Sequence, residues 1–190
     1  MRDIGQDAGV ALGAAYYYFT SKDAIVMDFY RRSCEEMRPK IEAALVDVSG
    51  LEDRPRELIR VKLTHFAPNR GVLRALLRNG ADLKRPLSPF SPQTREIRDI
   101  GIAWFGAILT DCGVRIPKDL APHLPDALWL CQMGVIWFWV VDDSADQART
   151  SRLLNLAAKC IASIVRVSAL PLMRPMRKAA LELVQIVKGL

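Results

Sequence analysis

The segment 128–141 constrains the fold of this chain more than any other part of the sequence. It reads Leu-Trp-Leu-Cys-Gln-Met-Gly-Val-Ile-Trp-Phe-Trp-Val-Val, and Gln132 is its only strongly polar residue. A helix that is apolar all round is either buried inside a protein or spans a bilayer. As an α-helix the segment would be about 21 Å long, whereas the hydrocarbon core of a bilayer is about 30 Å thick. The length therefore favours a buried helix, with one face on the protein's own core and the opposite face on another subunit.

Most of the chain carries apolar residues three and four positions apart, which is the spacing of one helix face. Val, Ile and Thr rarely alternate with polar residues over the length of a strand, so the sequence predicts an all-α fold. Pro39 is expected to kink or divide the third helix, and three prolines predict a loop at 84–92. The helices are expected at about 2–8, 12–19, 22–46, 54–66, 68–80, 93–112, 121–141, 145–167 and 171–187.

Composition excludes several classes of protein. The 190 residues are 51% hydrophobic and 25% charged, which does not fit a disordered chain, a collagen or a disulfide-rich miniprotein. The four cysteines form no CxxC pair and have no zinc-ligand spacing, which favours a reducing cytoplasm. The amino terminus lacks the apolar stretch of a signal peptide.

The sequence also lacks the common motifs of catalysis. It has no Gly-rich phosphate loop, no His-Glu-x-x-His and no nucleophile elbow. We therefore expect no catalytic residues, no cofactor and no metal.

The net charge of +6 is unevenly distributed. Residues 1–48 hold six Lys and Arg against eight Asp and Glu, which gives −2, so the remaining residues carry +8. A search for a basic surface would therefore place nucleic acid on the later part of the chain. The motif described next lies in the acidic part, so net charge does not decide the function.

Residues 4–23 carry the most informative pattern, which is the pattern of a helix-turn-helix. Ala8 is small where two helices would cross closely, and Gly9 can adopt the positive φ that the turn between them needs. Tyrosines at 16–18 provide phenol groups that can donate to phosphates or base edges. Lys22 opens the following helix, where its ammonium can join backbone amides on a phosphate.

This segment resembles the signature of the tetracycline-repressor (TetR) family of transcriptional regulators. That signature runs from Ile-Ala-x-x-Ala-Gly-Val through Gly-x-x-Tyr-x-x-Phe to a Ser-Lys-Glu helix start. The matching residues are Ile4, Ala8, Gly9, Val10, Gly13, Tyr16, Phe19, Ser21 and Lys22. Each of these residues alone would more often serve packing, whereas so many matches at fixed spacing are a strong signal.

The resemblance implies that residues 12–19 are a recognition helix for the DNA major groove. By family position, the residues that face DNA are Leu12, Gly13, Ala14, Tyr16, Tyr17, Tyr18 and Lys22. The family often has Ser, a basic residue and Thr where this chain has Ala11, Leu12 and Ala14, so a helix N-cap and some polar contacts are absent. The family also places a complete helix before this motif, and we expect that helix to be encoded upstream of Met1.

By the same resemblance, residues 1–46 would be the DNA-binding domain with its linker helix, and residues 47–190 the effector-binding and dimerisation domain. Aromatic and Met side chains commonly line ligand pockets. The candidate pocket residues are Met27, Tyr30, Cys34, Met37, Trp104, Phe105 and Ile108. The last long helices pair in family dimers, and the candidate interface residues are Trp129, Met133, Ile136, Trp137, Leu153, Leu156, Cys160 and Ile164.

The sequence thus predicts a ligand-responsive, homodimeric bacterial transcriptional regulator, in particular a cytoplasmic repressor without enzymatic activity. Its partners would be a palindromic double-stranded DNA operator, a second copy of itself and a small apolar effector, with no membrane. An acidic effector on Arg60, Arg74 or Arg78 is a weaker hypothesis than a solvated helix face. Two alternatives stay open: a helical small-molecule binding protein without DNA binding, and a membrane-surface adaptor that uses the apolar later half.

Overall fold

The computed structural model describes every residue except 1–5, 7–8, 10, 81–84, 111 and 189–190. The described residues form helices and no β-strand, which confirms the predicted all-α fold. The expected helix at 2–8 lies almost entirely outside the described residues. The helices are α2 (Leu12–Tyr18), α3 (Lys22–Ala44), α4 (Asp53–Phe66), α5 (Arg70–Gly80), α6 (Arg95–Thr110), α7 (Leu124–Val141), α8 (Ala148–Ser168) and α9 (Arg174–Lys188), with 3-10 turns at Ala67–Asn69, Ala145–Gln147 and Pro171–Met173.

Helix α3 begins where the sequence provides a cap. Ser21 is extended, and its hydroxyl accepts a hydrogen bond from the Ala24 amide at 3.1 Å. This bond satisfies one of the amides that a helix start leaves without a partner. Pro39 lies inside α3, which continues to Ala44, so the expected division of the helix is wrong. Pro39 is exposed and removes a single backbone hydrogen bond, while Ile41, two residues later, is buried in the core.

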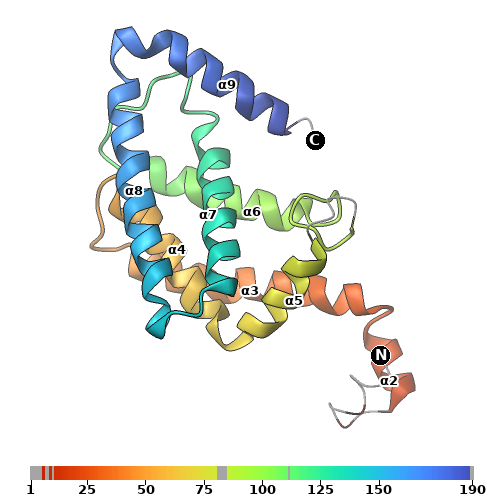
Figure 1. The fold of residues 1–190 in the computed structure, drawn as a ribbon. Helices are drawn as coiled ribbons and strands as arrows, with labels where there is room; N and C mark the ends of the chain where they lie inside the picture. Colours follow the sequence, from red (N-terminus) through yellow and green to blue (C-terminus); the bar gives the residue numbers. More distant parts are fainter. Residues whose placement is uncertain (1–5, 7–8, 10, 81–84, 111, 189–190) are drawn as a thin grey trace.

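Helix α7 is the central helix of the body (Figure 1). It packs against α4, α5, α6 and α8, and Leu128, Val135 and Trp139 are among its buried residues. Because α7 begins earlier than the apolar segment 128–141, it is long and apolar enough to cross a membrane by length and composition alone. This is weak evidence, since core helices pass the same test and 44% of the span is buried inside the protein.

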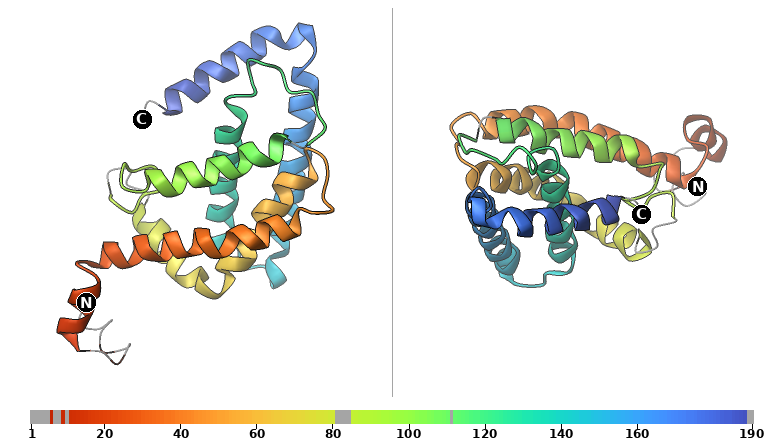
Figure 2. Two further views of the ribbon diagram at one scale, coloured as in Figure 1. Left: turned by 180° about the vertical axis from the view of Figure 1, so that it is seen from behind. Right: turned by 90° about the horizontal axis from the view of Figure 1, so that it is seen from above.

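The amino-terminal motif and the body are joined by α3. Helix α2 lies at the amino end of α3, away from the other helices (Figures 1 and 2). Later in α3, Cys34, Met37 and Ile41 are buried against the body. At the other end of the chain, α9 turns away from α8 with a bend of 103°. One continuous helix therefore connects the short α2 helix to the protein core.

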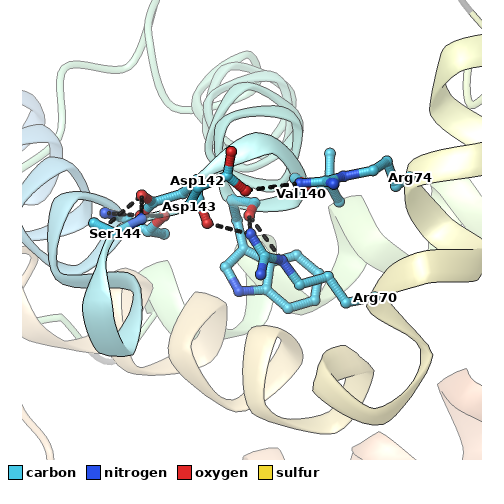
Figure 3. Close-up of polar contacts among 8 residues, drawn as sticks. Arg70, Arg74, Val140, Asp142, Asp143 and Ser144 are labelled. Carbon is cyan, nitrogen blue, oxygen red and sulfur yellow. Dashed lines mark hydrogen bonds and ion pairs between the residues drawn. The ribbon is translucent and has the colours of Figure 1, made fainter.

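Two arginines of α5 hold the carboxyl end of α7 (Figure 3). Arg70 donates to the Trp139 carbonyl at 2.8 Å and also to the Asp142 carbonyl. Arg74 donates to the Val140 carbonyl at 2.6 Å. The last carbonyls of a helix have no partner within the helix, and cations near that end also interact favourably with the helix dipole. These bonds therefore fix the position of α5 relative to α7.

The Asp142 carboxylate continues this network into α8. It accepts hydrogen bonds from the Thr150 amide and hydroxyl, at 2.8 and 2.6 Å, and from the Ser144 amide and hydroxyl, at 3.0 and 2.7 Å. The bonds from Thr150, followed by those from Ser144, hold the pKa of Asp142 well below its usual range. The turn between α7 and α8 is thus built around one ionised carboxylate.

Candidate functional site

A cavity of about 120 Å³ lies among α3, α4, α5, α6 and α7, with residues of the segment 85–94 at its edge. Its position follows from α7, which contributes an apolar wall while its neighbours supply the others. The apolar part of the lining includes Tyr30, Met37, Phe66, Leu73, Leu77, Ile97, Trp104, Trp129, Met133 and Ile136. An apolar cavity with a few polar groups is the usual form of a small-molecule site.

Lys62 of α4 places a buried ammonium group in this wall. Lys62 is 4% exposed, and its Nζ donates a hydrogen bond to Oε1 of Gln132 at 2.6 Å. Nζ also lies 4.6 Å from the centroid of the Trp104 ring, within reach of a cation–π interaction. Burial lowers the pKa of Lys62 to about 7, because removal from water disfavours the charged form, and the nearby Cys34 thiol opposes this shift.

Arg98 of α6 also lines the cavity and binds the segment that precedes α6. Its Nη1 donates to the carbonyls of Pro89 and Ser91 at 3.1 and 3.4 Å. The same segment is held by the Thr94 hydroxyl, which donates to the Ser88 carbonyl at 2.6 Å. Both serines are fully buried. The expected proline-rich loop is therefore a well-bonded edge of the cavity.

Four of the seven candidate pocket residues, Tyr30, Cys34, Met37 and Trp104, line this cavity. Burial raises the pKa of Tyr30 to about 12 and also raises the pKa of the Cys34 thiol. Both groups are therefore neutral near pH 7: the Tyr30 hydroxyl can donate or accept a hydrogen bond, whereas the Cys34 thiol is a weak donor.

The other three candidates lie elsewhere, so the predicted pocket needs correction. Phe105 is fully buried and Ile108 is 4% exposed, and both pack in the core. Phe105 is the next residue after Trp104 and lies about 100° further around α6, so its ring packs in the core, with its centroid 5.4 Å from Nζ of Lys62. Met27 is half-buried on an earlier turn of α3 and does not line the cavity.

Sequence reasoning missed Lys62, Gln132 and Arg98 as polar groups of this site. Lys62 lies four residues after Leu58 and four before Phe66, which places it on the apolar face of its helix. Gln132 is the one strongly polar residue in the apolar segment, and a buried amide needs a hydrogen-bond partner. Together these two signals point to a contact between α4 and α7. By contrast, Arg60 pairs with Glu57 and does not line the cavity.

The candidate interface residues separate into two groups. Trp129, Met133 and Ile136 line the internal cavity, so the structure places them inside the protomer and not on the surface that we assign to a dimer below. Because α7 is apolar on every side, the sequence pattern did not indicate which face of α7 points into the protein and which points outward. The other five are exposed on the described surface: Trp137, Leu153, Leu156, Cys160 and Ile164.

The candidate DNA-binding residues lie on and next to α2. Tyr16, Tyr17 and Tyr18 are 51%, 84% and 75% exposed, and Gly13 and Lys22 are exposed as well. Ala14 is half-buried, and Leu12 opens the helix. Before α2, Gly9 has φ = 67°, a conformation that favours glycine over other residues. The predicted turn glycine is therefore confirmed, and the tyrosines are free to contact a partner.

The Tetracyclin repressor-like, C-terminal domain family matches residues 57–181. The chain belongs to this family. No curated protein matches the chain. The match to this TetR-family domain begins within α4 and ends within α9, so it contains the cavity walls formed by α4, α5, α6 and α7. The TetR-type chain is thus a regulator whose helical ligand-binding domain holds the cavity, with residues 1–56 outside the match.

Proposed function

We propose that this TetR-family protein is a homodimeric transcriptional repressor that a small-molecule effector releases from its operator. The observation that carries the proposal is the path of α3. Its amino end follows α2 and carries Lys22, while Tyr30, Cys34 and Met37 on later turns line the cavity. Any occupant that changes the packing of these three residues would change the orientation of α2.

The mechanism is a shift between two dimer conformations. An effector that binds one conformation more tightly than the other increases the population of that conformation. The size of the shift is set by the difference between the two affinities. In the favoured conformation, the two recognition helices would no longer match the spacing of two half-sites. The division into a DNA-binding domain (residues 1–46) and an effector-binding and dimerisation domain (residues 47–190) is part of this proposal. In it, movement of α3 transmits the effect of the bound effector to α2.

Dimerisation is assigned to the exposed apolar surface of α7 and α8. On α8, Leu156 and Ile164 are 52% and 62% exposed, and on α7 Trp137 is 45% exposed. Large apolar side chains that stay exposed on the outer faces of helices commonly mark a protein interface. A two-fold interface also suits a palindromic operator, because both require the same symmetry.

The DNA-contacting residues are assigned to α2 and the start of α3. The phenols of Tyr16, Tyr17 and Tyr18 can donate to phosphates or base edges. Lys22 lies in the first turn of α3, where an ammonium and backbone amides can bind the same phosphate. Leu12, Gly13 and Ala14 would lie against the groove as the apolar part of the recognition helix.

The experiment is fluorescence anisotropy on duplex DNA from upstream of the protein's own gene, with an unrelated duplex for comparison. It is run with the chain and with a form that includes the residues encoded directly upstream of Met1. Selective binding that weakens with salt supports the proposal, because phosphate contacts release counterions. Tyr17→Ala and Lys22→Ala should each weaken binding and leave the oligomeric state unchanged. Lys40→Ala, also on α3, is the matched control and should bind as before.

The alternative function is that of a helical small-molecule binding protein without DNA binding. The cavity itself favours it, since the cavity does not depend on α2. Ligand binding in the absence of selective DNA binding by both forms would establish this alternative and exclude the repressor.

A further inference from the structure

The wall of the cavity is cationic at two places. Lys62 and Arg98 line it, whereas no Asp or Glu of the described residues does so. The Pro89 and Ser91 carbonyls accept hydrogen bonds from Arg98 but do not neutralise its charge. Positive charges in an apolar surrounding, without an acidic neighbour in the wall, favour an anionic occupant.

Lys62 has hydrogen-bonding capacity that the described part of the chain does not use. An ammonium group has three N–H donors, and Gln132 accepts one of them. The Trp104 ring stabilises a cation without taking a full hydrogen bond. On the exposed side of the same helix, Arg60 is paired with the carboxylate of Glu57. Buried Lys62 has no such partner among the described residues, although buried charges are normally paired.

We propose that the effector is a small carboxylic acid whose carboxylate binds Lys62 while its apolar part packs against Trp104 and Trp129. This inference rests on the proposed function, because it takes the cavity to be the effector site. The carboxylate would accept hydrogen bonds from the N–H groups of Lys62 that are not bonded to Gln132. Charge-assisted hydrogen bonds of this kind are shorter and stronger than neutral ones.

The volume of the cavity limits the size of the acid that can bind. Its volume of about 120 Å³ is similar to that of an apolar cavity that holds one benzene ring, about 150 Å³. A single ring or a short branched chain fits this space. Gly101 contributes to the fit, since a Cβ at this position would lie 3.1 Å from the Trp129 ring.

Carboxylate binding would change the protonation of Lys62. In the free protein, burial holds its pKa at about 7, and an adjacent carboxylate raises a lysine pKa. At pH 8 binding therefore takes up a proton, whereas at pH 6 the ammonium is already present. The titratable thiol and phenol of the lining do not interfere, because burial raises the pKa values of Cys34 and Tyr30.

The test is isothermal titration calorimetry of the full chain with benzoate and phenylacetate, and with benzamide and phenylacetamide as neutral isosteres. We expect the acids to bind roughly tenfold or more tightly than the amides at pH 6. From pH 6 to pH 8 the affinity for the acids should fall roughly tenfold, with proton uptake visible as a buffer-dependent enthalpy. The pH series requires no substitution, so it does not depend on the folding of a variant.

Two variants complete the test. Lys62→Met keeps an unbranched side chain and should remove both the preference for acids and the proton uptake. Lys40→Met changes an exposed lysine of α3 and should leave both unchanged. Equal binding of acids and amides, or no binding of either acid, overturns the inference.

The same compounds distinguish this inference from the proposed function. If a neutral amide releases the operator as well as benzoate does, the regulator is established and the acid preference is wrong. If the acids bind through Lys62 while neither form of the chain binds the operator, the acid site stands and the repressor is wrong.

Discussion

Trp137 and Trp139 lie two positions apart on α7 and have opposite environments. Trp139 is 1% exposed, and its indole nitrogen donates to Oε1 of Gln147. Trp137 is 45% exposed. Residue type and local sequence do not separate them, because both belong to the same apolar run. The difference teaches that the neighbours of α7, and not its composition, decide which tryptophan stabilises the fold and which remains free for a partner.

The largest effect is expected from truncation of the inner tryptophan. Trp139→Ala removes a fully buried ring from the packing between α5 and α7, and should lower the free energy of unfolding by about 3–5 kcal/mol. Chemical denaturation followed by circular dichroism measures this. Trp137→Ala is the control, with a change in the stability of the monomer of roughly 0.5 kcal/mol or less. Similar losses of unfolding free energy in both variants would contradict the inferred difference between Trp137 and Trp139.

The outer surface is tested by a charge on α8. Ile164→Glu places a carboxylate in the proposed dimer interface and should abolish dimers at micromolar concentration, because an unpaired buried charge is costly. Analytical ultracentrifugation gives the oligomeric state. Asn155→Glu introduces the same charge at an exposed position on the opposite side of α8 from Ile164 and should remain dimeric. A monomeric unmodified protein would remove the role assigned to this surface.

The polar network beyond Trp139 gives a pH-dependent prediction. The pKa of Asp142 is lowered by hydrogen bonds from Thr150 and Ser144, so its ionised form stabilises the fold at and above the usual aspartate pKa of about 4. Asp142→Asn should therefore be less stable than the unmodified protein at pH 7. The difference should shrink as the pH falls from about 4 towards 2. Urea unfolding at several pH values measures it, and a difference independent of pH would argue against this role.

The smallest effect concerns cysteine accessibility. Cys160 is exposed on α8, whereas Cys34 and Cys112 are buried. The thiol of Cys160 should react with a thiol reagent more slowly at high protein concentration, because the proposed dimer covers it. Ile164→Glu should restore the fast rate at all concentrations. A rate that does not depend on concentration would place Cys160 outside the interface.

The fold was predictable because most of its signals are local. The spacing of apolar residues identified the helices, Ser21 marked the start of α3, and Gly9 marked the turn before α2. Of the two outcomes expected at Pro39, a kink or a division, the division is wrong, because core packing by Met37 and Ile41 on either side of it outweighs one lost hydrogen bond.

The candidate site was less predictable because its residues come from distant parts of the chain. Trp104 was identified, whereas Phe105 beside it belongs to the core, and a rotation around α6 separates the two. The contact between Lys62 and Gln132 joins α4 to α7. No sequence pattern within α4 or α7 identifies the residue that a buried lysine contacts.

The sequence by itself determined that this protein is all-helical and that it carries a helix-turn-helix pattern of the TetR type. Both properties follow from propensity and periodicity within short segments. Only the tertiary structure decided that Trp129 faces a cavity while Trp137 faces outward, and that Lys62 lies in an apolar wall. The reason is physical: periodicity fixes the angles of side chains around one helix, whereas burial depends on which other helices cover each side.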